Sequence, residues 1–312
     1  MASPGKILVV GASGFIGRRL VESFSQAGHE VIALARRTPA PYFGTQVENV
    51  TASLDNSAVI EPLFRQCRIV FHVASDSTPG TTASQPVLEA GLNLMPTLRF
   101  IESLQKFPHL PLVYLSSGGG VYKPQVVGLL NENSAVQPAS YYGAGKIAIE
   151  EFIKAMVTQS NGLSLILRPG NIYGPGQYFR KGFGLVPTVF QHIVDCTPID
   201  IWGNGEVVRD YLYIDDFLLL CLAILEFDFH SIPFLLVNAG AGVGHSINEV
   251  CAIAENMCGH KLERNYWPSR SVDLNRIVLA SDLAKKMFGW EATTDLVSGT
   301  SQTWQWLKHH AR

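Results

Sequence analysis

The first half of the chain alternates short apolar runs with longer segments of helical periodicity. Lys6–Val10 (KILVV) is a continuous apolar run, which is typical of a strand that is covered on both faces. Similar runs predict strands at 29–35, 47–51, 68–73, 112–116 and 163–168, and helical patterns lie between them at 15–27, 57–66, 86–106 and 140–159. Because strands that alternate with helices form parallel βαβ units, we expect an α/β fold with a doubly wound parallel sheet.

The pattern changes after Pro169, where glycine and proline residues gather over residues 169–184. Shorter elements follow, with helices predicted at about 214–226, 247–258 and 296–308. The apolar run at 234–238 has the pattern of another buried parallel strand, so a segment of about 211–242 is expected to return to the first sheet. We therefore expect one domain over 1–169 and a smaller domain of mixed structure over 170–312.

Composition narrows the class of protein. Hydrophobic residues make up 47% of the 312 residues and charged residues only 16%, which excludes a disordered chain and indicates an extensive core. The formal net charge of −2 gives no electrostatic reason to expect nucleic acid or an anionic membrane as a partner. The longest apolar run, 217–225, is shorter than the roughly 20 residues that a membrane span needs.

The cysteines and the N-terminal pattern point to the cytoplasm. The five cysteines are odd in number and form no CxxC pair, which fits a reducing compartment rather than a disulfide framework. The N-terminal stretch lacks the basic region and the long apolar segment of a signal peptide. The sequence contains no HxxxH, HxH or acidic cluster of the kind that binds metal. We expect a cytoplasmic protein without a bound metal.

A glycine-rich turn, Gly11-Ala-Ser-Gly14-Phe-Ile-Gly17, joins the first predicted strand to the first predicted helix. Gly11 permits a tight turn, Gly14 lets the backbone approach a diphosphate, and Gly17 allows helix and strand to pack closely. The helix N-terminus adds backbone N–H groups and the positive end of the helix dipole. The pattern and its position predict a dinucleotide-binding site.

The end of the second predicted strand indicates which dinucleotide binds. An Asp or Glu usually meets the ribose 2′-hydroxyl of NAD at this position. This chain instead has Arg36 and Arg37, whose guanidinium groups suit a 2′-phosphate through charge-assisted hydrogen bonds. The residues favour NADP over NAD. The alternative is that two solvated arginines merely end a strand.

A third motif, YxxxK, lies at the start of the predicted helix 140–159. Tyr142 and Lys146 are four residues apart and so share one face of that helix. A nearby ammonium group favours the phenolate and lowers the pKa of a tyrosine toward the range of a general base. Upstream, a predicted strand ends in Ser116-Ser117 and three glycines, 118–120, at the edge of the sheet where ligands bind.

With these motifs in this order, the sequence resembles the extended short-chain dehydrogenase/reductases, and within them the NAD-dependent epimerase/dehydratase group. The resemblance covers nearly the whole chain. Its carriers are GASGFIG at 11–17, HVA at 72–74, Asn93, YYGAGK at 141–146, RPGNIYGPGQ at 168–177, GFGLVP at 182–187, IWGNG at 201–205, RDYLYIDD at 209–216 and the stretch 270–276. The family implies a Rossmann-like dinucleotide-binding domain over 1–169, a nucleotide-sugar-binding domain over 170–312, and a homodimer formed through the helices at 86–106 and 140–159.

The resemblance also implies roles for single residues. Tyr142 is the acid/base, Lys146 lowers the tyrosine pKa and holds the nicotinamide ribose, and Ser117 hydrogen-bonds the reacting oxygen. The implied cofactor contacts are Gly11, Ser13, Gly14, Phe15, Ile16, Gly17, Arg36, Arg37, Ala74, Asn93, Tyr142 and Lys146. The implied contacts with a nucleotide-sugar substrate are Ser117, Asn171, Val186, Arg209, Arg270 and Asp273, with Asn171 and Arg209 at the diphosphate.

Two departures from the family pattern bear on these roles. An ungapped alignment through Tyr122 places Gly118 where the epimerases have their catalytic Ser or Thr, whereas alignment by the strand end places Ser117 there, and we choose Ser117. The dehydratases of the family need an Asp-Glu pair in this loop to eliminate water, and here the loop is three glycines, which argues against a dehydratase. The glycines are expected to leave room for a sugar to turn.

The sequence therefore predicts a nucleotide-sugar 4-epimerase that acts on a UDP-hexose through a transient 4-keto sugar, with hydride transfer to and from a bound nicotinamide. The alternative is a reductase of a 4-keto-6-deoxy nucleotide sugar, which would use the same residues and consume NADPH. A non-catalytic nucleotide-binding protein is a third hypothesis, which the presence of both Tyr142 and Lys146 disfavours.

Overall fold

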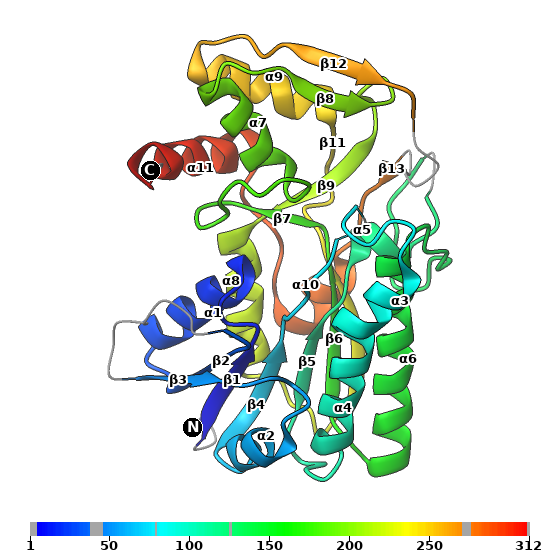
Figure 1. Ribbon diagram of the computed structural model, residues 1–312. Coiled ribbons are helices and arrows are strands. Elements are labelled where there is room, and N and C mark those ends of the chain that lie inside the picture. The colour runs from blue at the N-terminus through cyan, green and yellow to red at the C-terminus, as the bar shows by residue number, and fades with distance from the viewer. Residues whose placement is uncertain (1–4, 38–45, 79, 125–126, 270–275, 311–312) are drawn as a thin grey trace. The chain divides into compact units, whose positions relative to one another are not determined.

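The computed structural model describes residues 5–37, 46–78, 80–124, 127–269 and 276–310, and its elements are labelled in Figure 1. The chain forms two compact units. The first unit comprises Met1–Ser117, Tyr141–Arg168 and Leu218–Val237, and the second comprises Gly118–Ser140, Pro169–Phe217 and Asn238–Arg312. Each unit is therefore assembled from three separate segments of the chain.

The first unit is built around a seven-stranded sheet with the order β10-β6-β5-β4-β1-β2-β3. Its strands are β1 (Lys6–Val10), β2 (Val31–Ala35), β3 (Val47–Thr51), β4 (Cys67–His72), β5 (Leu112–Leu115), β6 (Ser164–Pro169) and β10 (Phe234–Ala239). The registers that join β6 through to β3 are parallel, which confirms the predicted doubly wound sheet. The chain runs outward from β1 to β3 and returns to β4 on the other side of β1, so the β1–β4 boundary is the switch point at which such sheets bind ligands.

Helices cover the two faces of this sheet. They are α1 (Phe15–Gln26), α2 (Ser57–Phe64), α4 (Met95–Leu104) and α6 (Tyr141–Ser160). α2, α4 and α6 share one core cluster with the strands, in which Phe100 of α4 and Val70 of β4 are both fully buried. α1 packs on the other face through Phe24, whose ring centroid lies 4.9 Å from that of Phe71. Neighbouring strand residues therefore enter different apolar layers, which explains the continuous apolar runs of the sequence.

The helix predicted over 86–106 is interrupted. The structure has α3 (Pro86–Glu89), a π-helical turn, η1 (Ala90–Leu94), and then α4. Pro96 lacks the N–H that an α-helix would direct to the carbonyl of the residue four positions earlier, and a wider turn accommodates this loss. Asn93 lies in the π-helical turn and is buried.

The second unit holds two smaller sheets. Their strands are β7 (Asn171–Tyr173), β9 (Val208–Tyr213), β11 (Gly244–Ser246) and β13 (Arg276–Ile277) in one sheet, and β8 (Ile199–Trp202) and β12 (Arg264–Trp267) in the other. The helices of this unit are α5 (Gly118–Val121), α7 (Leu185–Val194), α9 (Ile247–Cys258), α10 (Asp282–Phe288) and α11 (Leu296–His310), and α8 (Ile214–Ile224) runs from this unit into the first. β9 pairs in parallel with β7 and β13 and antiparallel with β11, which confirms the mixed structure expected here.

Residues 118–140 belong to the second unit, a grouping that the apolar pattern did not indicate. Tyr122 is fully buried and donates a hydrogen bond to Asn238 Oδ1 at 2.7 Å. Asn238 Nδ2 in turn donates to the carbonyl of Leu130 at 2.9 Å. These contacts tie the segment to a residue more than 100 positions away, which local sequence patterns cannot predict.

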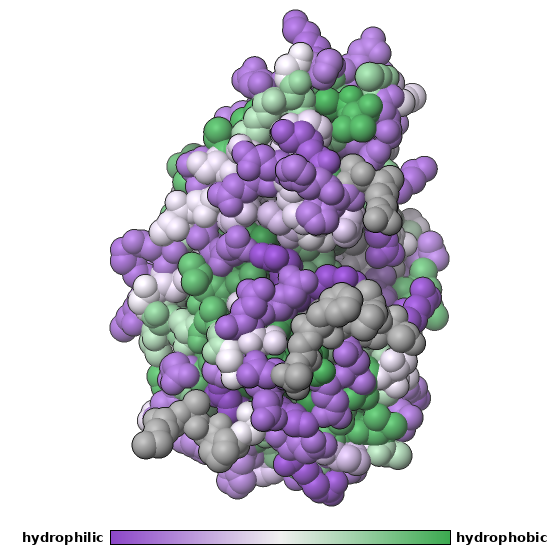
Figure 2. Space-filling view, turned by 90° about the vertical axis from the view of Figure 1, so that its left-hand side faces the viewer, coloured by the Kyte–Doolittle hydropathy of each residue, from purple (hydrophilic) through white to green (hydrophobic). Residues whose placement is uncertain are grey.

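The surface mixes polar and apolar residues. On the face shown in Figure 2, hydrophilic side chains cover much of the area and hydrophobic side chains lie in separate groups between them. Within the described ranges, no helix combines the length and the apolar character that a membrane crossing requires.

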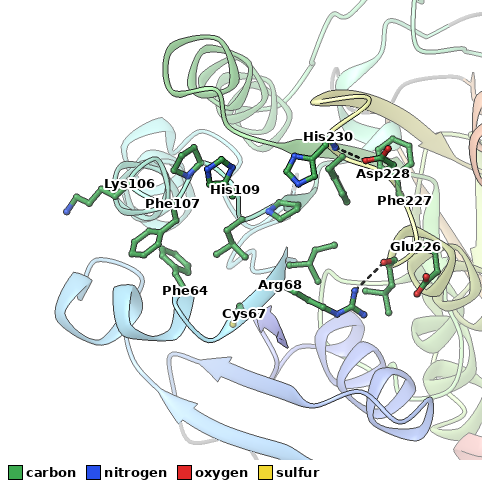
Figure 3. Close-up of a pocket in the computed structure, with 16 residues that line it drawn as sticks. Phe64, Cys67, Arg68, Lys106, Phe107, His109, Glu226, Phe227, Asp228 and His230 are labelled. Carbon is green, nitrogen blue, oxygen red and sulfur yellow. Dashed lines mark hydrogen bonds between the residues drawn. The ribbon is translucent and has the colours of Figure 1, made fainter. Parts of the chain in front are cut away.

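A cavity of about 620 Å³ lies at the amino ends of β4 and β5 (Figure 3). Its walls include the rings of Phe64 and Phe107, whose centroids are 5.4 Å apart, and the side chains of Arg68, His109 and His230. Doubly wound sheets bind their ligands at the carboxyl ends of the strands, so this cavity lies at the opposite end of the sheet from the predicted site.

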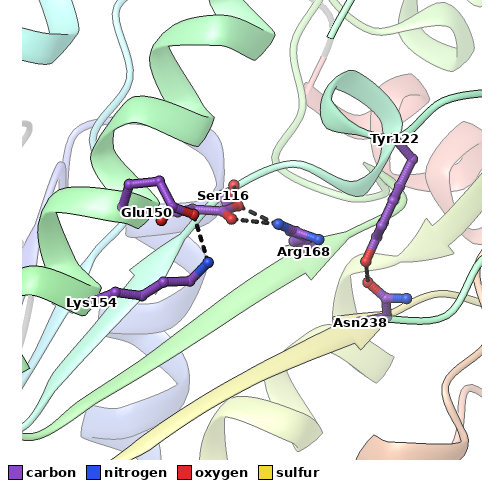
Figure 4. A network of polar contacts seen from close by, with 7 residues as sticks. Ser116, Tyr122, Glu150, Lys154, Arg168 and Asn238 are labelled. Carbon is purple, nitrogen blue, oxygen red and sulfur yellow. Dashed lines mark hydrogen bonds and ion pairs between the residues drawn. The ribbon is translucent and has the colours of Figure 1, made fainter. Parts of the chain in front are cut away.

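Glu150 of α6 and Arg168 of β6 form a buried ion pair (Figure 4). Arg168 Nη2 lies 2.5 Å from Glu150 Oε2, and Arg168 Nε donates to Oε1 at 3.0 Å. The hydroxyl of Ser116, directly after β5, donates to the same carboxylate at 2.5 Å. Three hydrogen bonds therefore join α6 to β5 and β6 at the carboxyl end of the sheet.

We predict that Glu150→Gln lowers the free energy of unfolding by about 3–5 kcal/mol, because it leaves the charge of Arg168 buried without its partner. Urea denaturation followed by circular dichroism measures the change. Glu151→Gln is the matched control. Glu151 follows Glu150 on the same helix, and its exposed ion pair with Lys154 should contribute less than about 1 kcal/mol. Equal losses in the two variants would contradict the structural role of the buried pair.

Candidate functional site

The glycine turn between β1 and α1 is packed so closely that side chains are excluded at two positions. Gly11 has a φ of +92°, and a Cβ atom there would lie 2.7 Å from the Cα atom of Ala74. A Cβ atom on Gly17 would lie 2.1 Å from the carbonyl oxygen of Gly11, so helix and strand touch directly. Gly14 caps α1 without a side chain, which leaves the first-turn N–H groups of the helix for an anion.

These features fit the diphosphate of a dinucleotide. The turn presents bare backbone and a helix N-terminus at the β1–β4 switch point. Ser13 is exposed on the turn, and Phe15 and Ile16 form the first turn of α1. In the part of the chain that the structure describes, no group of three or more His, Cys, Asp or Glu side chains is arranged to hold a metal ion.

Arg36 and Arg37 directly follow β2 and are exposed. Arg36 forms a bidentate ion pair with Asp76, in which Nη1 lies 2.6 Å from Oδ2 and Nη2 lies 3.1 Å from Oδ1. Asp76 belongs to the loop after β4, on the other side of β1. The end of β2 itself carries no carboxylate, as the sequence indicates, but the loop after β4 brings the carboxylate of Asp76 beside Arg36.

Asn93, implied as a cofactor contact, is tied to the same loop. Its Oδ1 accepts a hydrogen bond from the backbone N–H of Asp76 at 2.8 Å, and its Nδ2 donates to Ser77 Oγ at 2.7 Å and to Glu89 Oε1 at 2.8 Å. Only 9% of Asn93 is exposed. In this structure it positions the loop that packs beside the glycine turn.

The structure brings Ser117, Tyr142 and Lys146 together within the first unit. Tyr142 and Lys146 lie in the first turns of α6, and Ser117 follows β5 and hydrogen-bonds Tyr142. The Lys146 ammonium donates to the carbonyl of Leu115 at 2.8 Å, and its Nζ lies 5.7 Å from the centroid of the Tyr142 ring. A phenol, a hydroxyl and an ammonium group thus stand at the carboxyl end of the sheet.

Burial dominates the ionisation of these groups. It raises the pKa of Tyr142 to about 12, while the hydrogen bond with Ser117 lowers this pKa and Glu89 raises it. Burial also lowers the pKa of Lys146 to about 8, although Glu89 and Glu150 act to raise it. The pKa of Tyr142 in this structure therefore lies above its ordinary value, because loss of solvation outweighs the hydrogen bond with Ser117.

The position of Gly118 leaves no room for the side chain of a catalytic Ser or Thr. It is buried in α5, and a Cβ atom there would lie 2.9 Å from the carbonyl oxygen of Pro169 and 2.5 Å from Cδ1 of Leu279. The three glycines lie in the short helix α5, and the open space that the sequence suggests is already filled at Gly118. Ser117 is the hydroxyl that reaches Tyr142.

Glu89 is a candidate functional residue that the sequence motifs did not indicate. It is 4% exposed, and its carboxylate accepts hydrogen bonds from Ser77 at 2.6 Å, from Thr82 at 2.8 Å and from Asn93 at 2.8 Å. A Cβ atom on Gly145 would lie only 3.2 Å from Glu89 Oε1. The glycine directly before the motif lysine was the one signal in the sequence that another group approaches α6 closely at this point.

Three of the implied substrate residues lie in the second unit. Asn171 is exposed at the start of β7, and Arg209 is on the neighbouring strand β9, where its Nη1 donates to the carbonyl of Val208 at 2.9 Å. Val186 is buried in α7. Arg270 and Asp273 fall outside the described residues.

Comparisons with known proteins find similar sequences and structures over most of the length of the chain. The model of the NAD dependent epimerase/dehydratase family matches residues 7–239. A putative UDP-glucose 4-epimerase of Methanocaldococcus jannaschii is 28% identical, with 98% of this chain and 99% of the relative covered. The dTDP-4-dehydro-6-deoxyglucose reductase of Escherichia coli is 24% identical, with 94% of each chain covered. The crystal structure of a UDP-glucose 4-epimerase of Thermus thermophilus in complex with NAD has a TM-score of 0.89 and 26% identity, covering 98% of this chain and 99% of that chain.

We predict that the Lys146 side chain titrates with a pKa of about 8, so that it is charged below this pH and neutral above it. Glu89→Gln removes a carboxylate that raises this pKa, so the titration should move to lower pH. Carbon-13 NMR of lysine labelled at Cε measures the titration, and Lys146→Met identifies the resonance. Glu151→Gln, on the exposed side of α6, is the control and should leave the titration unchanged. An unshifted resonance in Glu89→Gln would contradict the charge coupling.

Proposed function

The chain belongs to the NAD dependent epimerase/dehydratase family, and we propose that it is a nucleotide-sugar 4-epimerase acting on a UDP-hexose. The observation that carries this proposal is the group formed by Ser117, Tyr142 and Lys146, in which a single acid/base has a hydroxyl partner at the carboxyl end of the sheet. One residue that takes a proton and later returns it suits a reaction whose substrate and product have the same oxidation state. Similarity to proteins named UDP-glucose 4-epimerase supports the choice of reaction.

In the proposed reaction, the Tyr142 phenolate takes the proton of the sugar 4-hydroxyl while Ser117 donates a hydrogen bond to the same oxygen. When bound, the nicotinamide supplies the chemistry that takes a hydride from C4 and returns it to the opposite face, and in its oxidised form it adds a positive charge that favours the phenolate. The sugar is a 4-keto compound between these two events and must turn over before the second. Tyr142 then returns the proton to the oxygen, so the net reaction inverts C4 and consumes no proton.

Lys146 contributes its charge and its hydrogen bonds. At neutral pH it remains mainly protonated, because Glu89 and Glu150 offset the effect of burial on its pKa. Its ammonium group lies close enough to the Tyr142 ring to favour the phenolate over the phenol. We assign the binding of the nicotinamide ribose to this same ammonium group.

We assign the nucleotide end of the substrate to the second unit. Arg209 and Asn171 lie on adjacent strands and would contact the diphosphate, for which a guanidinium group is suited through paired hydrogen bonds. Val186 would line the nucleotide base, and Arg270 and Asp273 would close over it, as the family resemblance implies.

A reductase of a 4-keto-6-deoxy nucleotide sugar is the second candidate. Similarity to the Escherichia coli dTDP-4-dehydro-6-deoxyglucose reductase favours it. It would use Tyr142 and Lys146 as above, but would consume one equivalent of reduced coenzyme in each turnover. Arg36 and Arg37 would suit the 2′-phosphate of NADPH in that case.

We further propose that the protein is a homodimer formed through α3, α4 and α6. These helices expose large apolar side chains, since Val87 is 84% exposed, Met95 48% and Phe152 49%. Exposed apolar residues that gather on neighbouring helices are typical of a surface that a second copy covers.

We expect the purified protein to interconvert UDP-glucose and UDP-galactose without added coenzyme, as measured by NMR of the sugar products. Tyr142→Phe should lower kcat by about 10²–10⁴-fold, because the general acid/base is lost. Tyr141→Phe is the matched control, since this neighbouring tyrosine is 45% exposed, and it should retain activity. A protein that instead reduces a 4-keto sugar with stoichiometric NADPH would be a reductase, and full activity of Tyr142→Phe would contradict the acid/base assignment.

For the dimer, we predict that Phe152→Glu produces monomers at micromolar concentration, because it places a charge in an apolar contact. Analytical ultracentrifugation measures the change in mass. Leu219→Glu is the control: Leu219 is 58% exposed on α8, away from the proposed surface, and its variant should remain dimeric. A wild-type protein that sediments as a monomer would rule out the proposed dimer.

A further inference from the structure

Arg36 and Asp76 form an ion pair across the strand that leads into the glycine turn. Arg36 follows β2 and Asp76 follows β4, and these two strands lie on either side of β1 (Figure 1). Both Nη atoms of the guanidinium group reach the carboxylate, at 2.6 Å and 3.1 Å. The pair therefore spans the carboxyl end of β1, where a doubly wound sheet binds a dinucleotide.

The loop that carries Asp76 is fixed against the glycine turn. Ala74 packs so closely that a Cβ atom on Gly11 would lie 2.7 Å from its Cα atom. The backbone N–H of Asp76 donates to Asn93 at 2.8 Å, and Asn93 is held in turn by the buried carboxylate of Glu89. Asp76 is thus held beside Arg36 by contacts that do not involve its own carboxylate.

The ion pair matters little for the fold but directly affects the charge of the site. The two side chains are 50% and 42% exposed, and exposed ion pairs contribute little to stability. A ribose 2′-phosphate at the end of β2 would meet a guanidinium group that already donates to a carboxylate, and would be repelled by that carboxylate. A ribose 2′-hydroxyl can donate a hydrogen bond to the same carboxylate and meets no such repulsion.

We propose that Asp76 is the residue that selects the cofactor: its carboxylate engages Arg36 and repels a 2′-phosphate, so that the site takes NAD rather than NADP. The inference rests on the nicotinamide dinucleotide of the proposed function. In this proposal, Asp76 in the loop after β4 takes the part of the acidic residue that the end of β2 lacks. It also replaces the expectation of NADP, which came from Arg36 and Arg37 without their tertiary partner.

Asp76→Asn tests this role, because it keeps the size of the side chain and the backbone hydrogen bond to Asn93 while removing the charge. We expect the variant to bind NADPH about tenfold more tightly than the wild type and NADH within about twofold, since removing one charge a few ångströms from a phosphate has an effect of this order. Each reduced coenzyme is titrated into protein freed of bound nucleotide, and energy transfer from the tryptophans reports binding.

Two further variants control for the effect. Glu61→Gln removes a carboxylate from another exposed ion pair of the first unit, with Lys106 at 2.7 Å, and should leave both affinities unchanged. Arg36→Ala combined with Asp76→Asn should abolish the gain for NADPH, because the released guanidinium group is then absent. Thermal unfolding of each variant without coenzyme checks that the fold is intact.

An unchanged ratio of the two affinities in Asp76→Asn would overturn the assignment. An equal loss of both would also overturn it, because Asp76 would then only support the loop, and a loss confined to NADPH would show that Asp76 orients Arg36 toward the phosphate. A wild-type protein that binds neither coenzyme would refute the cofactor of the proposed function, and this inference with it. An unchanged ratio with both coenzymes bound would refute the role of Asp76 alone.

Discussion

The site depends on the orientation of α6, and the buried ion pair between Glu150 and Arg168 sets that orientation. Removing both charges from water costs several kcal/mol, and such pairs are often no more stable than apolar replacements. The value of this pair therefore lies in its geometry. Glu150 is four residues after Lys146 and so shares its helix face, and the three hydrogen bonds on Glu150 prevent α6 from rotating or sliding on the sheet. Lys146 is held from the same strand end, through the carbonyl of Leu115.

This arrangement leaves two buried carboxylates close to a single ammonium group. Glu89 and Glu150 both raise the pKa of Lys146, which keeps the lysine charged near neutral pH although burial acts against this. Glu89 acts against ionisation of Tyr142, because a negative charge nearby raises the pKa of the phenol. The protein alone thus holds a charged lysine beside a neutral tyrosine. Further positive charge would favour formation of the phenolate, and a bound ligand can supply it.

The parts of this structure that the sequence predicted are those that depend on neighbours along the chain. The strands of the first sheet, the glycine turn and the pairing of Tyr142 with Lys146 follow from short-range periodicity and spacing. The roles of Asp76 and Glu89 could not be predicted in this way, because their partners come from other βα units, up to 40 residues away in the case of Arg36. The interruption of the helix at η1 lies between these extremes, since Pro96 marked the place but not the form of the distortion.

Arg36 shows why a local pattern can identify a binding site and still give its charge incorrectly. Two arginines in succession indicate a positive subsite, and that interpretation holds only while no carboxylate approaches from elsewhere in the fold. In a doubly wound sheet the loops of successive strands converge at one edge, so the charge at the end of β2 is the sum of contributions from several loops. Asp76, which belongs to the loop after β4, offsets part of the positive charge of the two arginines. The carboxyl edge of the sheet, rather than any single motif, is therefore the unit in which the electrostatics of the dinucleotide site are determined.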